Sequence, residues 1–261
     1  MAVTVPVKKA RAASSRGTSL REPVSGSGTA TKAARKPPVP VADRRIYHVT
    51  HIGNLAAIVE RGSVLSEASA VAGAVDDAVP VFSQQALSDR SATRVPGRDS
   101  GVADHVSFTL TPNSSVWESI RAGIDDPRLD PAAAGAAPAE FVILVSTVRL
   151  AIAARAADDA AAGSGVVVTD GYAAGALTRF ATTGDDVQRM LSALGDDDEP
   201  SALVDAELLV PGDFPFESVT LIGVANDRVR DEVRRIHHAA AHAPKVAVYP
   251  PWFQASEDVR Y

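Results

Sequence analysis

The feature that most constrains the fold of this chain is an unbroken apolar run, EFVILVST, at residues 140–147. β-Branched and aromatic residues favour strands, and a strand without polar alternation is usually covered on both faces. The run is far shorter than the roughly 20 apolar residues of a membrane span, and no other run in the sequence approaches that length. We therefore expect a buried strand inside a sizeable core, and no membrane association.

Weaker patterns on either side of this run complete an α+β domain, which we expect over residues 43–261. Further strands are predicted at 44–52, 104–110, 165–170, 207–210, 218–225 and 245–250. Short helices are predicted within 53–62, 111–123 and 226–242, with Gly62 and Gly123 as stops and Asn226 as an N-cap. Residues 66–103 read as irregular and residues 125–139 as a linker-like insertion.

The charge of the chain is divided unevenly. Residues 1–40 contain eight Lys or Arg and one Glu, a charge of +7. The whole chain has a net charge of −6, so residues 41–261 have a net charge of −13. The leader is rich in Ala, Ser, Gly and Pro and lacks a hydrophobic period, which predicts a disordered segment over 1–42. Its basic charge favours phosphate contacts with nucleic acid, and the alternative is a solvated tail without a partner.

Cysteine is absent, which excludes disulfides, thiolate zinc sites and a cysteine nucleophile. Together with the lack of an apolar secretory stretch at the N-terminus, this favours the cytoplasm. His238 and His242 have the spacing of metal ligands on a helix, but no third ligand is evident, so no metal is expected.

The segment LVDAELLVPG, residues 203–212, carries acidic residues inside an apolar strand. Alternation places Ala206, Leu208 and Val210 on one face, and Asp205 and Glu207 on the other. This pattern fits a half-buried strand whose polar face meets water. It also fits a catalytic carboxylate held on a rigid support.

Other polar residues lie where a ligand could bind. His48 and Thr50 share one face of the first strand, and either a structural or a ligand-binding role fits them. Arg90 and Arg94 are either solvated or a pyrophosphate clamp. Asp170 ends a strand at a turn, where ligands often approach.

Taken in order, these segments resemble the DarT family of bacterial toxins, which ADP-ribosylate DNA using NAD. The resemblance covers about residues 44–261. The segments that carry it are IYHVTHIGNLAAIVERG, SDRSATRVP, DHVSFTLTPNSSV, TDGYAAGALTRF, DAELLVPGDFPFESV and KVAVYPPWF.

The resemblance implies an ADP-ribosyltransferase-like fold, with two packed, mostly antiparallel sheets, an NAD cleft between them and peripheral helices. It implies that Glu207 and Arg90 are catalytic, with Arg94 as the alternative arginine. The carboxylate would stabilise positive charge on the ribose as nicotinamide leaves. NAD as co-substrate would be bound by His48, Thr50, Asn54, Arg94, Phe108 and Ser114, and the acceptor by Asp170, Tyr172 and Thr178.

The implied partners are NAD, single-stranded DNA and a separate antitoxin protein. Several positions depart from the family pattern: Ser107, Thr109, Asn113, Val116, Trp117 and Tyr172. These departures leave two alternatives open. One is an ADP-ribosyltransferase whose acceptor is RNA or protein, and the other is a catalytically silent relative that binds NAD or nucleic acid.

Overall fold

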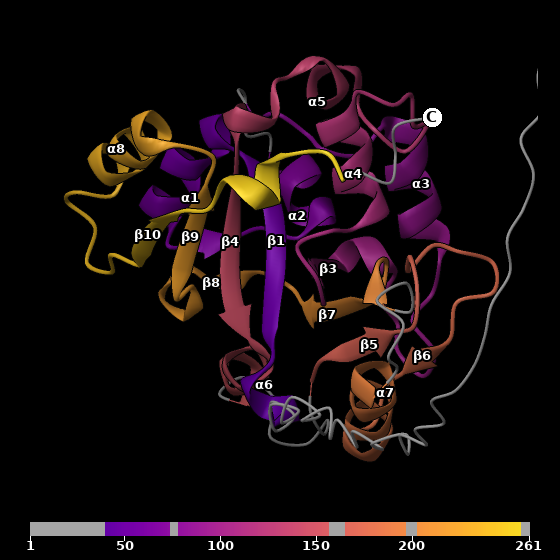
Figure 1. Ribbon diagram of the computed structural model, residues 1–261. Coiled ribbons are helices and arrows are strands. Elements are labelled where there is room, and N and C mark those ends of the chain that lie inside the picture. The colour runs from indigo at the N-terminus through magenta and orange to yellow at the C-terminus, as the bar shows by residue number, and fades with distance from the viewer. Residues whose placement is uncertain (1–39, 74–77, 157–164, 197–202, 257–261) are drawn as a thin grey trace, which may run out of the picture. The chain divides into compact units, whose positions relative to one another are not determined.

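The computed structural model describes residues 40–73, 78–156, 165–196 and 203–256, and its centre is an eight-stranded sheet (Figure 1). The strand order is β10-β9-β4-β1-β3-β7-β5-β6, and every neighbouring pair is antiparallel except β9 and β10. The strands are β1 (Arg45–His51), β3 (His105–Thr109), β4 (Phe141–Thr147), β5 (Val167–Thr169), β6 (Phe180–Ala181), β7 (Glu207–Pro211), β9 (Leu221–Val224) and β10 (Lys245–Val248). A second, two-stranded sheet pairs β2 (Ser63–Val64) with β8 (Phe214–Pro215).

The large sheet consists of two halves that are joined by very little pairing. Between β1 and β3 the register contains one residue pair, Tyr47 with Thr109. In contrast, β1 pairs with β4 through seven residues and β3 with β7 through five. The strands β1 and β3 therefore separate on leaving this pair, and the sheet opens at the seam between them.

Eight α-helices surround the sheet in the described part of the chain. They are α1 (Leu55–Arg61), α2 (Glu67–Ala72), α3 (Gln84–Ala92), α4 (Ser115–Ala122), α5 (Pro131–Gly135), α6 (Val148–Ala156), α7 (Gly184–Asp196) and α8 (Asp227–Ile236). Gly62 ends α1 with a left-handed φ of 73°, which glycine adopts without a steric penalty. The Asn226 side chain accepts a hydrogen bond from the Val229 amide and so begins α8, as predicted.

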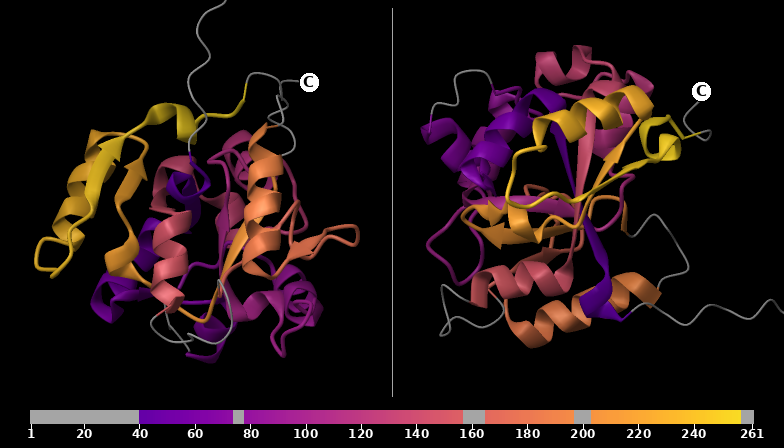
Figure 2. Two further views of the ribbon diagram at one scale, coloured as in Figure 1. Left: turned by 90° about the horizontal axis from the view of Figure 1, so that it is seen from below. Right: turned by 90° about the vertical axis from the view of Figure 1, so that its left-hand side faces the viewer.

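The central strand β4 is covered on both faces, which confirms the prediction from its apolar run. Val142 and Leu144 belong to the main hydrophobic core, together with residues of α1, α6, α7 and α8. Phe141, Ile143 and Val145 belong to a second core with α4 and α5. The right-hand view of Figure 2 shows α6 and α7 at the bottom of the molecule and α5 at the top.

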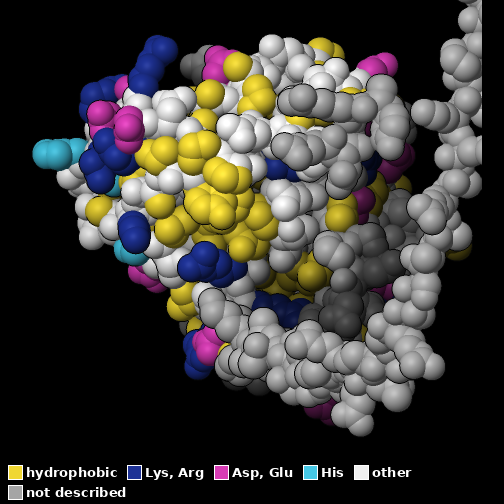
Figure 3. Space-filling model, viewed as in Figure 1, with side chains coloured by type: hydrophobic (Ala, Val, Ile, Leu, Met, Phe, Trp, Pro, Cys, Tyr) yellow, Lys and Arg dark blue, Asp and Glu magenta, His cyan; other side chains and the backbone are white. Residues whose placement is uncertain are grey.

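A short 3-10 helix, η7 (Pro250–Phe253), completes this second core near the C-terminal end of the described chain. The Trp252 ring packs against Tyr47 and Tyr249, with ring centroids 5.5 and 4.8 Å away. Figure 3 shows hydrophobic side chains gathered on this face of the molecule.

Two predictions of irregular structure are wrong. Residues 66–103 contain α2 and α3, and residues 125–139 contain α5. The buried residues of α3 are Ala86 and Arg90, and α2 has no buried residue. Neither helix therefore has the hydrophobic period by which a helix is predicted from sequence. The prediction of a disordered leader falls almost wholly on residues 1–39, outside the described residues. Among the helices that are described, none is long and apolar enough to cross a membrane.

Candidate active site

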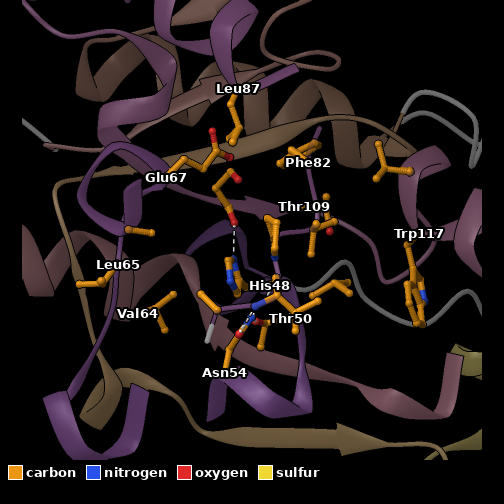
Figure 4. Close-up of a pocket in the computed structure, with 18 of the residues that line it drawn as sticks. His48, Thr50, Asn54, Val64, Leu65, Glu67, Phe82, Leu87, Thr109 and Trp117 are labelled. Carbon is orange, nitrogen blue, oxygen red and sulfur yellow. Dashed lines mark hydrogen bonds between the residues drawn. The ribbon is translucent and has the colours of Figure 1, made fainter. Parts of the chain in front are cut away.

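A cavity of about 370 Å³ opens where β1 and β3 separate (Figure 4). Both halves of the sheet contribute to its wall. His48 and Thr50 come from β1, Ser107 and Thr109 from β3, and Glu207 from β7. The volume lies in the range typical of sites for small molecules and cofactors.

Glu207 lies on a strand whose opposite face is core. Ala206, Leu208 and Val210 are fully buried in the main core. Glu207 itself is only 5% exposed, although it lines the cavity. The interpretation of this strand as half-buried with a polar face in water is therefore wrong. Asp205 has a structural contact instead, because its Oδ1 accepts a hydrogen bond from the Ser115 amide at the start of α4.

Arg90 holds the Glu207 carboxylate in a two-point contact. Arg90 Nη1 donates to Glu207 Oε1 over 3.2 Å, and Nη2 donates to Oε2 over 3.0 Å. The Ala173 amide adds a third hydrogen bond, to Oε1 over 2.8 Å. Such bidentate, charge-assisted contacts fix both the position and the plane of the carboxylate.

The guanidinium of Arg90 is fully buried, between aromatic rings and two carboxylates. Its central carbon lies 4.9 Å from the Phe82 ring centroid and 5.4 Å from that of Tyr172. Burial alone would lower the pKa of Arg90, but the charges of Glu207 and Glu67 outweigh it and raise the pKa further. Arg94, the alternative arginine, is exposed and does not line the cavity.

Sequence reasoning missed Glu67, the second carboxylate on Arg90. Arg90 Nε donates to Glu67 Oε2 over 2.8 Å, and Glu67 lines the cavity. Burial raises the pKa of Glu67, and the Arg90 charge opposes this rise. Glu67 lies in the first turn of α2, behind its N-cap Ser66. The only local sequence pattern at Glu67 is a serine followed by an acidic residue. This pattern is typical of the start of a helix and does not indicate a functional site.

His48 belongs to β1, and its ring contacts β3, on the other side of the seam. Its Nδ1 is 2.9 Å from the carbonyl oxygen of Ser107, which can only accept, so Nδ1 carries the proton. Burial lowers the pKa of His48, and the Ser107 carbonyl opposes this. The ring is therefore neutral, with Nε2 as an acceptor.

Thr50 and Asn54 are joined to the segment that follows α2. Asn54 Nδ2 donates to Thr50 Oγ1 over 3.1 Å and to the Val79 carbonyl over 2.9 Å. The Val79 amide donates back to Asn54 Oδ1 over 2.8 Å. This exchange fixes one wall of the cavity to β1, and all three residues line it.

Of the remaining predicted site residues, two line the cavity and three do not. Ser114 and Tyr172 line the cavity, and Ser114 is also the N-cap of α4. Phe108 is fully buried beneath the His48 ring, at a centroid distance of 5.6 Å. Asp170 pairs with Arg179, and Thr178 donates to the Tyr172 carbonyl, so both organise the loop that carries Tyr172. No group of three or more His, Asp or Glu residues suited to a metal ion occurs in the described part of the chain.

The architecture of this molecule is shared with solved structures. "Thermus sp. 2.9 DarT in complex with ADP-ribosylated ssDNA" matches with a TM-score of 0.62 and 24% identity, over 84% of this chain and 99% of its own. The same Thermus protein in complex with NAD+ matches with a TM-score of 0.58, 24% identity and coverage of 84% and 100%. "Thermosipho africanus DarTG in complex with ADP-ribose" matches with a TM-score of 0.59 and 17% identity, over 80% of this chain and 51% of its own. The chain thus shares the fold of these DarT structures, as predicted.

A protein-family model gives more than this likeness in fold. The model described as "ssDNA thymidine ADP-ribosyltransferase, DarT" matches residues 47–254. The chain belongs to the DarT family, and the predicted enzyme class, an ADP-ribosyltransferase that uses NAD and acts on single-stranded DNA, is confirmed. A comparison with curated proteins finds no match.

Proposed function

We propose that the cavity at the seam binds NAD, that Glu207 catalyses transfer of its ADP-ribose to a thymine base of single-stranded DNA, and that Arg90 positions Glu207. One observation carries this assignment. Glu207 is a buried carboxylate at the cavity wall, fixed by three hydrogen bonds from Arg90 and Ala173. A group that must stabilise developing charge benefits from being held in place before the reaction begins.

In this proposal Glu207 faces the ribose that is attached to nicotinamide. The bond between ribose C1′ and the nicotinamide nitrogen breaks, and nicotinamide leaves with the electron pair as a neutral molecule. The Glu207 carboxylate stabilises the positive charge that develops on the ribose. A thymine ring nitrogen then supplies the electron pair of the new bond to C1′, and its proton passes to Glu207.

Arg90 acts through Glu207 in this proposal. Its guanidinium contacts Glu207 and Glu67 and has no exposed surface. A direct contact with the pyrophosphate of NAD would require it to leave two buried carboxylates without a counter-charge, which is costly. We therefore assign Arg90 to the orientation of Glu207.

The adenosine half of NAD is assigned to the β1 side of the cavity. His48 Nε2 offers an acceptor for a ribose hydroxyl, since Nδ1 is committed to Ser107. Thr50 and Asn54 shape the adjoining wall. The acceptor base must reach the site unpaired, which single-stranded DNA allows at low cost.

The remaining parts of the proposal concern the cellular role. We infer a toxin of the cytoplasm that a separate antitoxin protein counteracts. The resemblance to the DarT toxins supports this, and so does the likeness to a chain described as DarTG, of which this chain covers 51%.

The test uses NAD labelled in its adenylate half, with the wild-type protein and the Glu207→Gln variant. We expect label on single-stranded oligonucleotides that contain thymidine and none on matched oligonucleotides that lack it. Glu207→Gln should reduce labelling by about 100-fold or more. Glu217→Gln, which makes the same change at an exposed residue of η6 (Phe216–Ser218), is the control.

The other outcomes separate the alternatives. Nicotinamide release with label on RNA or protein, and none on DNA, would replace the proposed acceptor. Binding of NAD without any turnover by the wild-type protein would identify a silent relative and overturn the role of Glu207.

A further inference from the structure

Glu67 makes a one-sided contact with Arg90. Its Oε2 accepts from Arg90 Nε, whereas both Nη atoms of Arg90 bind Glu207. The other oxygen, Oε1, is buried and forms no hydrogen bond with any residue that the structure describes. A buried carboxylate oxygen without a donor is costly, so its retention calls for an explanation.

Among the residues that the structure describes, none donates a hydrogen bond to Oε1. The nearby charged groups are Arg90, committed through its Nε and Nη atoms, and the like charge of Glu207. The Ser107 side chain is near enough to favour the ionised form of Glu67, but Oε1 forms no hydrogen bond to it. Figure 4 shows Glu67 near Leu87 and Phe82, across from His48 and Thr50, and all five residues line the cavity.

We propose that Glu67 is a second functional carboxylate of this site: Oε2 orients Arg90, and Oε1 accepts a hydrogen bond from the nicotinamide-ribose half of NAD. The inference rests on the proposed function, which places that half at Glu207. One guanidinium binds both carboxylates, so Glu67 and Glu207 lie side by side at the same end of the cavity. The ribose hydroxyls and the carboxamide N–H groups of nicotinamide are the donors available at that end.

Two substitutions at this position separate the two oxygens. Glu67→Gln keeps an oxygen for Arg90 Nε but presents an amide donor to NAD in place of Oε1. We expect the KM for NAD to rise about tenfold or more while kcat changes little, because the lost contact is made in the ground state as well. Glu67→Ala loses both contacts, so we expect kcat to fall as well.

Glu60→Gln is the matched control, since Glu60 is an exposed glutamate of α1 and the charge change is identical. Nicotinamide release gives KM and kcat, calorimetry gives NAD affinity, and circular dichroism confirms that each variant is folded. Unchanged KM and unchanged NAD affinity in folded Glu67→Gln would overturn the role of Oε1. A proportional loss of kcat in Glu67→Gln and Glu67→Ala, with KM unchanged, would reduce Glu67 to support of Arg90.

This result is distinguishable from failure of the proposed function. If the wild-type protein transfers nothing to DNA, the proposed function fails whatever Glu67 does. If the wild-type protein is active and Glu67→Gln behaves as Glu60→Gln does, the proposed function stands and this inference fails.

Discussion

Arg90 balances the charge of the cavity wall, because it is the cation that binds both Glu207 and Glu67. Removing it would leave two buried carboxylates facing each other. Breaking a buried ion pair by loss of one partner typically costs about 3–5 kcal/mol. We expect Arg90→Ala to lower the free energy of unfolding by about this amount, measured by urea denaturation.

The matched control lies four residues away. Arg94 is exposed, so Arg94→Ala should change the free energy of unfolding by less than about 0.5 kcal/mol. Arg90→Lys should recover part of the stability and little of the activity, since an ammonium cannot make both the Nε and the two Nη contacts. Equal stability of Arg90→Ala and Arg94→Ala would contradict the described pairing.

His48 gives a prediction about pH. Burial lowers the pKa of His48 below the ordinary value of about 6.5. As the pH falls, His48 is therefore protonated in the unfolded chain before it is protonated in the folded protein. The contribution of His48 to stability is therefore present above pH 6.5 and is lost as the pH falls toward the lower, folded pKa. An NMR titration of the His48 ring should show its midpoint below about 6.5, and a midpoint above that value would contradict the neutral tautomer described above.

The sequence allowed Glu207 to be singled out because a carboxylate within an apolar strand is conspicuous. The family resemblance favoured Arg90 and kept Arg94 as the alternative. The residues themselves did not distinguish the two, since both lie in a polar stretch and only the packing of α3 turns one of them inward. Glu67 was not predictable for the same reason. Its significance comes from a contact with a residue 23 positions away, and no local pattern records that contact.

At the scale of elements, the strands and the helices with clear caps were predictable. The strands β1, β3, β4, β5, β7, β9 and β10 lie where the apolar patterns indicated, and α1, α4 and α8 begin or end at the expected residues. The helix α5 was missed because its five residues are Pro, Ala and Gly, a composition typical of linkers, and a single alanine is buried. The helices α6 and α7 were not assigned from the sequence.

One glycine controls how η7 packs on the sheet. A Cβ added at Gly223, in β9, would lie 2.7 Å from Trp252 Cζ3, and the Trp252 ring packs against Tyr47 at the cavity. We expect Gly223→Ala to displace Trp252 and to lower the free energy of unfolding by about 1–3 kcal/mol. Thermal denaturation and tryptophan fluorescence would detect both effects.

Gly184→Ala is the control for this substitution. Gly184 begins α7 and has no neighbour within 4 Å of an added Cβ, so alanine should be neutral or slightly stabilising there. An unchanged fluorescence spectrum and stability in Gly223→Ala would show that Trp252 does not pack as described.

At the scale of the whole molecule, the opposite charges of the leader and the remaining chain make a prediction about DNA binding. Removing residues 1–39 takes away eight basic residues and one acidic residue. We expect weaker binding of single-stranded DNA and a shallower dependence of affinity on salt, with the KM for NAD unchanged. Fluorescence anisotropy at several salt concentrations measures this, and identical salt slopes for the two proteins would show that the leader does not contact phosphates.

The single pair of residues that joins the two halves of the sheet has a consequence for how the protein responds to its co-substrate. Each half has its own extensive strand pairing, while a single residue pair connects β1 with β3. A ligand held by His48 on one side and Glu207 on the other would act as a cross-link between two bodies that the backbone couples weakly. Binding of the ligand would then restrict the motion of the two halves relative to each other, including residues that do not contact the nucleotide.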